Sequence, residues 1–161
     1  LPDVVSSQEE SVSEQEHAAV LDAVGQALAH LDEFRTQEGA ILIADLLKRI
    51  DRIEAYKQEV IPFEKARTEV DNNRLEQEMI FYLEKLDITE EKVRLTNHCN
   101  YFREVAASEE CAGRKLGFIA QEMGREINTM GSKANNSEIQ ILVVKMKDEL
   151  EKIKEQVLNI L

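Results

Sequence analysis

Apolar residues recur every three or four positions along most of this chain, and this spacing predicts amphipathic α-helices. The first helix is expected to begin at Ser13, because Ser13 and Glu16 have the spacing of a capping box. A second helix is expected to follow Gly39 and to end near Pro62. The only stretch with strand character is residues 1–5.

The second half of the chain contains the stronger helical patterns. The sequence predicts a short helix over 74–86, a longer one over 89–107 and a third over 114–130. Thr89 is the expected N-cap of the second of these helices, because a threonine hydroxyl can accept from a free backbone N–H.

The last predicted helix is expected to begin with a capping box formed by Ser137 and Gln140. Its apolar residues alternate at spacings of three and four, which predicts a seam for a partner helix within the chain or across an oligomer interface. The seam consists of Val143, Met146, Leu150, Ile153, Val157 and Ile160.

These patterns together predict an all-α fold, in which long antiparallel helices form a bundle. A charged, featureless segment at 64–74 is the expected boundary between two parts, 1–70 and 71–161. One shared core is expected to contain Leu116, Met123, Ile127, Val143, Met146 and Leu150.

The composition fits a folded protein without membrane helices, since 43% of the residues are hydrophobic and no apolar run approaches the roughly 20 residues that a membrane helix needs. Cys99 and Cys111 form no CxxC pair, which argues against a disulfide scaffold or a structural zinc site and favours a reducing cytoplasm. The first residues lack the features of a signal peptide and of a natural start, so the chain is expected to be a fragment or a processed piece.

Charge is unevenly distributed. The net charge of −12 argues against nucleic-acid binding by the chain as a whole. However, residues 1–88 carry 20 acidic and 9 basic side chains, whereas residues 89–134 carry 7 of each. The acidity therefore lies outside the segment that contains the most unusual polar residues.

That segment is "QEMGREINTMGSK", residues 121–133. At about 100° per residue, one face of its helix is a core stripe and the other gathers a polar cluster. The cluster consists of Glu122, Arg125, Glu126 and Thr129, with Phe118 in the same arc, and Lys133 joins it if the helix continues past Gly131. Carboxylates four residues apart can share a divalent metal ion. The alternative, a solvated face with pairs inside the helix, remains open.

A second polar face lies on the preceding helix, where Glu90, Glu91, Arg94, His98 and Tyr101 share one side. A histidine beside a cation is a candidate proton-transfer group for phosphate chemistry. A lone histidine is more often structural, so a structural role for His98 also remains open.

Three stretches resemble the C-terminal domain of the YicC/YloC family of bacterial endoribonucleases. They are "ITEEKVRLTNHCNYF" (88–102), "GRKLGFIAQEMGREINTMGSKANNSEI" (113–139) and "LVVKMKDELEKIKEQVLNI" (142–160). The resemblance covers residues 77–161, and residues 1–66 resemble more loosely the helical end of the family's N-terminal region. It implies that the chain is a fragment of a larger α+β protein, without that family's β-rich N-terminal portion. It also implies that residues between Val70 and Arg74 are missing relative to the family.

The resemblance further implies a cytoplasmic, metal-dependent enzyme that cleaves single-stranded RNA as a homo-hexamer, with Mn²⁺ or Mg²⁺ as cofactor. Carried over by position, the implied catalytic residues are His98, Glu122, Arg125 and Glu126, with Glu122 and Glu126 holding the metal. The implied RNA contacts are Arg94, Gln121, Asn128, Thr129, Ser132 and Lys133.

A second hypothesis is a non-catalytic helical scaffold for oligomerisation, or an RNA-binding protein associated with stress response. The seam of the last helix and the acidity of residues 1–88 favour it. The enzyme hypothesis predicts that the Arg94/His98 face and the Glu122/Glu126 face converge on one cleft. The scaffold hypothesis predicts that Arg94, His98 and Glu122 pair with each other or with neighbouring subunits and leave no accessible cavity.

Overall fold

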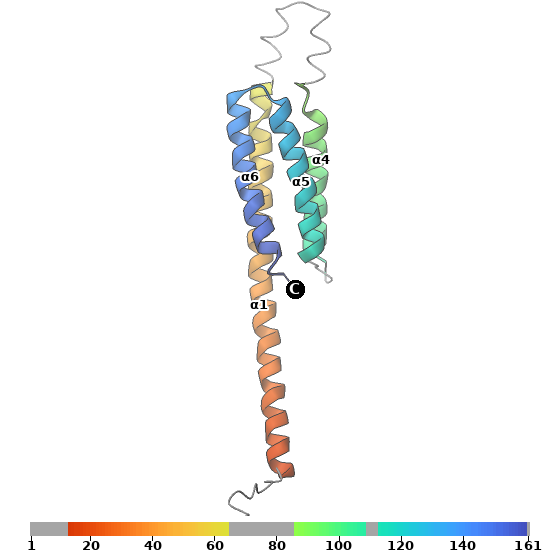
Figure 1. The fold of residues 1–161 in the computed structure, drawn as a ribbon, viewed down its shortest axis with the longest axis vertical. Coiled ribbons are helices and arrows are strands. Elements are labelled where there is room, and N and C mark those ends of the chain that lie inside the picture. The colour runs from red at the N-terminus through yellow and green to blue at the C-terminus, as the bar shows by residue number, and fades with distance from the viewer. Residues whose placement is uncertain (1–12, 65–85, 109–112, 161) are drawn as a thin grey trace, which may run out of the picture. The chain divides into compact units, whose positions relative to one another are not determined.

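The computed structural model describes residues 13–64, 86–108 and 113–160. Their helices are α1 (Glu14–Glu59), α4 (Thr89–Ala106), α5 (Gly113–Lys133) and α6 (Ser137–Val157) (Figure 1). None of these described residues belongs to a strand, so the predicted all-α class is confirmed. The predicted helix over 74–86, the boundary near residue 70 and the gap between Val70 and Arg74 fall outside the described residues, apart from Leu86.

Helix α1 is continuous through Gly39, so the predicted break there is wrong. A Cβ at Gly39 would meet nothing within 4 Å, and a single helical glycine costs only about 1 kcal/mol relative to alanine. The predicted capping box at the start of the helix is confirmed. The Ser13 backbone N–H donates to Glu16 Oε2 at 2.9 Å, and the Glu16 N–H donates to Ser13 Oγ at 3.2 Å.

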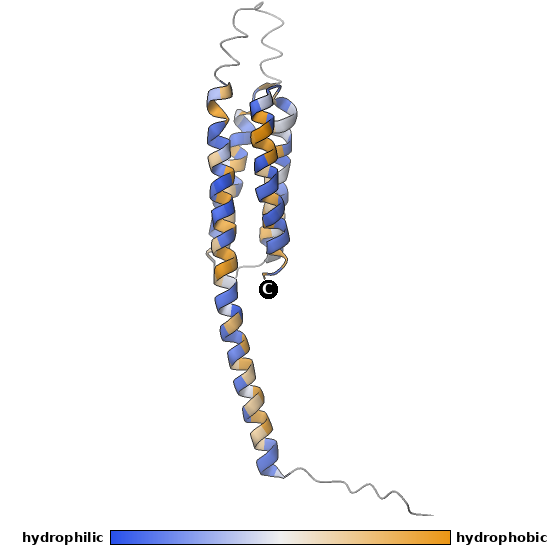
Figure 2. Ribbon diagram, turned by 90° about the vertical axis from the view of Figure 1, so that its left-hand side faces the viewer, coloured by the Kyte–Doolittle hydropathy of each residue, from blue (hydrophilic) through white to orange (hydrophobic). Residues whose placement is uncertain are grey.

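Contacts divide the chain into two compact units, residues 1–40 and residues 41–161. In the first unit, the described residues form only the first part of α1. One helix alone cannot bury an apolar face, and hydrophobic and hydrophilic residues alternate along it (Figure 2). Its exposed large apolar residues are Val20, Leu21, Val24, Leu28, Leu31 and Phe34.

In the second unit, the later part of α1 packs with α4, α5 and α6 around one hydrophobic core. Helices α4, α5 and α6 follow one another along the chain, and each runs antiparallel to the one before it (Figure 1), as predicted. The six predicted core residues are all buried in a single cluster: Leu116, Met123, Ile127, Val143, Met146 and Leu150. Within the described ranges, no helix is long and apolar enough to cross a membrane.

The seam of α6 faces this core. Five of its members are buried within the chain, namely Val143, Met146, Leu150, Ile153 and Val157, and Ile160 packs against them. The partner helices of this seam therefore belong to the same chain. A face already covered in this way is not available as an oligomer interface.

The two helix caps differ from those predicted. The N-cap residue of α4 is Ile88 and not Thr89. The backbone N–H of Thr89 donates to Asp87 Oδ1 at 2.9 Å. Asn136 caps α6, because its side chain accepts from the N–H of Glu138 and of Ile139. In both cases the acceptor is a short Asx side chain just outside the helix.

Gln140, the other half of the predicted box at α6, has a different role. Its amide donates to the carbonyl oxygen of Ala134 at 2.8 Å and to that of Gly131. It thereby satisfies carbonyl groups at the end of α5 that have no partner inside their own helix. The turn between α5 and α6 is closed by this side chain.

Candidate functional site

The two predicted polar faces meet at one ion pair. Arg94 on α4 donates from Nε to Glu126 Oε2 on α5 at 2.9 Å. Helices α4 and α5 pack through their apolar stripes, which are fully buried. The stripes include Leu95 and Cys99 on α4 and Met123 and Ile127 on α5. The structure thus brings together residues that lie 32 positions apart in the sequence.

Arg94 also binds two carboxylates of its own helix. Its Nη1 lies 3.0 Å from Glu90 Oε2, and its Nη2 lies 3.0 Å from Glu91 Oε1. The hydrogen bond with Glu126, followed by that with Glu90, raises the pKa of Arg94 above its ordinary value. The guanidinium group therefore holds three carboxylates at once, which uses its planar array of donors.

Lys133 completes the group because α5 continues past Gly131. Its Nζ lies 2.9 Å from Glu91 Oε1 and donates to the Asp87 carbonyl oxygen at 3.1 Å. We call Glu90, Glu91, Arg94, Glu126 and Lys133 the Arg94 cluster. Three carboxylates against two cations leave it with a formal charge of −1.

Glu91 is the member of the Arg94 cluster whose importance the sequence did not reveal. Its side chain is only 2% exposed, and its Oε2 has no hydrogen-bond partner within the described part of the chain. The sequence indicated only that Glu91 precedes Arg94 by three residues and lies in the first turn of a helix. Its burial depends on α5 and Lys133, which no local pattern reports.

Glu122 and Arg125 stand apart from the Arg94 cluster. Glu122 Oε1 lies 3.0 Å from Arg125 Nη1, and the two side chains are 43% and 74% exposed. An exposed pair within one helix contributes little to stability. This pair has the form that the solvated-face interpretation predicted.

The remaining predicted site residues surround these groups. His98 is half-buried and forms no hydrogen bond or ion pair with a described residue. Gln121 and Asn128 are exposed on α5. The hydroxyl groups are used within the helix itself, since Thr129 Oγ1 donates to the Arg125 carbonyl oxygen at 3.0 Å and Ser132 Oγ donates to that of Thr129 at 2.9 Å.

A divalent metal ion was predicted between Glu122 and Glu126. No group of three or more His, Cys, Asp or Glu residues that could hold a metal is present among the described residues. Two carboxylates one turn apart do fit the mode in which Mg²⁺ is held by one or two carboxylates, water and a substrate phosphate. Each of the two now pairs with an arginine.

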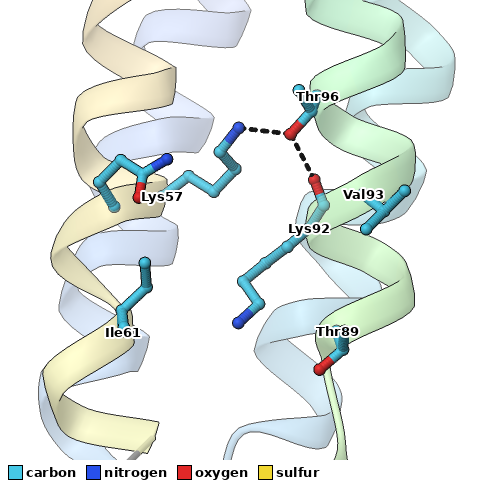
Figure 3. Close-up of a pocket in the computed structure, with 7 residues that line it drawn as sticks. Lys57, Ile61, Thr89, Lys92, Val93 and Thr96 are labelled. Carbon is cyan, nitrogen blue, oxygen red and sulfur yellow. Dashed lines mark hydrogen bonds between the residues drawn. The ribbon is translucent and has the colours of Figure 1, made fainter.

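A separate pocket of about 190 Å³ lies between α1 and α4 (Figure 3). Lys57, which is buried, donates from Nζ to Thr96 Oγ1 at 2.5 Å across it. Its ammonium group also lies 3.6 Å from Glu54, and Lys92 lies 2.5 Å from Glu64. Both cations have acidic partners, so the pocket is explained as a packing feature between two helices.

Comparison with known proteins places these residues in a family. Residues 48–161 match the family model described as "Endoribonuclease YicC-like, C-terminal". The chain is 36% identical, over 179 aligned positions, to a protein named "Probable endoribonuclease YicC" from Clostridioides difficile, an alignment that covers 99% of this chain and 61% of that relative. It is 38% identical over 98 residues to a protein of the same name from Haemophilus influenzae, covering 61% of this chain and 34% of the relative.

The chain thus spans about three fifths of the length of the first of these relatives. The alignment has 179 positions and the chain has 161 residues, so the alignment contains gaps in this chain. The family model covers the whole of α4, α5 and α6, and with them every predicted site residue. The chain belongs to the YicC-like endoribonuclease family, and it contains that family's C-terminal domain.

Proposed function

We propose that the protein to which this chain belongs is an endoribonuclease that cleaves single-stranded RNA with the help of a divalent metal ion. The observation that carries the proposal is the contact between Arg94 and Glu126. It joins the two polar faces that the sequence singled out, on helices matched by the endoribonuclease family model. The names of the relatives support the reaction class.

In this proposal the cations of the site bind phosphate oxygens of the RNA. Arg125 is the most accessible of them, with 74% of its side chain exposed. Arg94 and Lys133 contribute after exchanging a carboxylate partner for a phosphate oxygen, since both now bind Glu91. The half-buried His98, one turn after Arg94, transfers a proton during cleavage.

Glu122 and Glu126 are the proposed ligands of Mn²⁺ or Mg²⁺. A divalent ion there supplies positive charge next to the scissile phosphate. The formal charge of −1 on the Arg94 cluster is consistent with this requirement, because an RNA phosphate is repelled by a site with excess carboxylate. Releasing Glu126 from Arg94 frees a carboxylate and the Nε donor of the guanidinium group in the same step.

The proposed assembly is a homo-hexamer in the cytoplasm that encloses its RNA substrate. The seam of α6 is used inside the chain, so the contacts between copies must involve other surfaces. The exposed apolar residues of the first unit, from Val20 to Phe34, are one candidate surface among the described residues.

The test is cleavage of a single-stranded RNA by the full-length protein over a wide Mn²⁺ range. Glu122→Gln keeps the shape and the hydrogen-bonding capacity of the side chain but removes its charge. Turnover is expected to fall at least about 100-fold, which corresponds to about 2.7 kcal/mol of transition-state stabilisation. Glu151→Gln is the matched control, because Glu151 also forms an exposed pair three residues away, on α6.

The alternative is a non-catalytic scaffold or RNA-binding protein, and one observation favours it. Arg94 already binds three carboxylates, so the cluster is complete without RNA. This alternative predicts that Glu122→Gln, Glu126→Gln and His98→Ala leave the residual cleavage of the purified protein unchanged. Cleavage at the parent rate by both glutamine variants would remove the proposed metal site.

A further inference from the structure

A pocket of about 390 Å³ lies between the first turns of α5 and the residues at and just after the end of α6. It is lined by Arg114, Gly117, Phe118 and Gln121 from α5, and by Val157 and Ile160 from the other side. Among the described residues that line it, only Arg114 is charged. The volume is within the usual range for pockets that bind small organic ligands. No residue of the Arg94 cluster lines it.

Phe118 gives this pocket an aromatic wall. Its side chain is 56% exposed, and Arg114 Cζ lies 5.8 Å from the centre of its ring. A scattered exposed apolar residue needs no explanation, but a ring beside a guanidinium group at a pocket is a more specific arrangement. Gln121, three residues further along α5, adds an amide that can donate and accept hydrogen bonds.

The next residue of α5 forms a second pair of a cation and an aromatic ring. Lys115 Nζ lies 5.3 Å from the ring centre of Tyr101 on α4, and Tyr101 is 43% exposed. Two consecutive residues, Arg114 and Lys115, therefore each accompany an exposed aromatic ring. Single-stranded nucleic acids are bound in this manner, by rings that stack on bases and cations that attract the backbone.

The local charge favours an anionic ligand. The first turn of α5 contains no acidic residue, although acidic side chains are the usual choice at a helix N-terminus. Arg114 and Lys115 occupy that turn instead, in a chain whose net charge is −12. RNA is the occupant that this charge favours, because Arg114 lines the pocket, Lys115 follows it in the same turn, and none of the described lining residues is acidic.

We propose that this pocket receives a nucleobase of the single-stranded RNA, stacked on Phe118, with neighbouring phosphates bound by Arg114 and Lys115. Gln121 contacts the edge of the base. The inference rests on the proposed function and extends it by a base-binding position. Phe118 precedes Glu126 by eight residues, roughly 12 Å along α5, so the bound strand runs from this pocket toward the Arg94 cluster.

The test compares two probes on the full-length protein: a short single-stranded oligoadenylate and an abasic strand of the same length. Phe118→Ala is expected to weaken binding of the oligoadenylate by about 5-fold to 100-fold, the range for loss of one stacked base. Binding of the abasic strand should be unchanged. Phe118→Trp should retain binding of the oligoadenylate. Val144→Ala, which removes an exposed apolar side chain from α6, is the control and should change neither affinity.

A second variant fills the pocket without touching Phe118. A Cβ at Gly117 would meet only Val157 Cγ2, at 3.8 Å, which is an ordinary contact. A substitution is therefore tolerated at the Cβ, and Gly117→Leu should place its longer side chain in the pocket and weaken oligoadenylate binding as Phe118→Ala does, whereas Gly117→Ala should not. The melting temperatures of both variants verify that they fold. Parent-like binding by Phe118→Ala and Gly117→Leu overturns the base pocket while the parent still cleaves RNA.

Two further outcomes would contradict the base pocket. Equal loss of affinity for both probes in Phe118→Ala, together with a smaller sedimentation coefficient, would identify Phe118 as a contact between copies of the protein and overturn the inference. A parent protein that neither binds nor cleaves RNA contradicts the proposed function itself, and the base pocket with it. The parent measurement therefore separates the two failures.

Discussion

Lys133 Nζ lies 2.9 Å from Glu91 Oε1, and this ion pair joins the last residue of α5 to the first turn of α4. Glu91 is nearly inaccessible to solvent, whereas Lys133 retains partial exposure. The contact is therefore not an ordinary surface pair. It neutralises a carboxylate that the packing of α4 against α5 has removed from water.

Lys133→Ala is expected to lower the free energy of unfolding by about 1–3 kcal/mol, because it leaves a buried carboxylate oxygen with one partner fewer. Arg125→Ala, which breaks the exposed pair with Glu122, should change it by less than about 0.5 kcal/mol. Urea denaturation of both variants measures the difference. Equal stabilities would mean that Arg94 alone compensates the charge of Glu91.

Two glycines of α5 should respond oppositely to the same substitution. A Cβ at Gly113 would lie closer than van der Waals contact to the carbonyl oxygens of Val157 and Ile160, which are backbone atoms and cannot turn aside. Gly113→Ala should therefore cost about 1–3 kcal/mol. Gly117→Ala has room and should stabilise the helix by up to about 1 kcal/mol. Thermal unfolding of the pair checks both signs.

Cys99 should be inert in the folded protein. Burial, followed by the nearby Glu54 carboxylate, raises the pKa of its thiol to about 12. The reactive thiolate is thus almost absent at neutral pH. In a Cys111→Ser background, labelling of Cys99 by a thiol reagent should occur only at the rate at which the core opens. Rapid labelling without denaturant would contradict the burial of this side chain.

Asp87 should make stability depend on pH at the acidic end. The hydrogen bonds from the Thr89 hydroxyl and from its backbone N–H lower the pKa of Asp87 below its ordinary value of 3.8. A lowered pKa in the folded state means that the charged form contributes stability above about pH 4. That contribution disappears as the pH falls through the folded pKa.

The check compares the parent with Asp87→Asn, which still accepts both hydrogen bonds but carries no charge. The difference between their unfolding free energies should be greatest above pH 4 and should shrink below it. A difference that stays constant down to pH 2 would show that the charge of Asp87 does not contribute.

The helical fold could be predicted in detail because periodicity reports burial directly. All six residues predicted to share one core, from Leu116 on α5 to Leu150 on α6, are buried. The caps were harder, since Thr89 and Ser137 compete with Asp87 and Asn136 for the same role within two residues. Local sequence does not decide which of two adjacent polar side chains reaches the free N–H groups.

Gly39 and the seam of α6 illustrate two further limits. A glycine in a helical pattern is a plausible stop, but its cost of about 1 kcal/mol is too small to end a helix whose flanks continue the pattern. The seam predicted a partner without specifying which one. The choice between the same chain and another copy depends on tertiary packing.

The candidate site could be predicted as two separate faces but not as one cluster. The pairing of Arg94 with Glu126 follows from the register between α4 and α5, which the sequence does not specify. The same register buries Glu91 and leaves Glu122 exposed, although both are glutamates on polar helix faces. The roles of the carboxylates therefore had to come from the structure.

The three carboxylates bound to Arg94 have a consequence for how salt should act on RNA binding. A free arginine that contacts a phosphate displaces counterions from the RNA, and the steepness of the salt dependence counts such contacts. In the proposed RNA complex, Arg94 instead exchanges a carboxylate for a phosphate, and the released carboxylate takes up a cation from solution, which cancels part of that release. The salt slope is therefore expected to undercount the phosphate contacts of that complex, by up to the number of arginines and lysines that exchange a carboxylate partner.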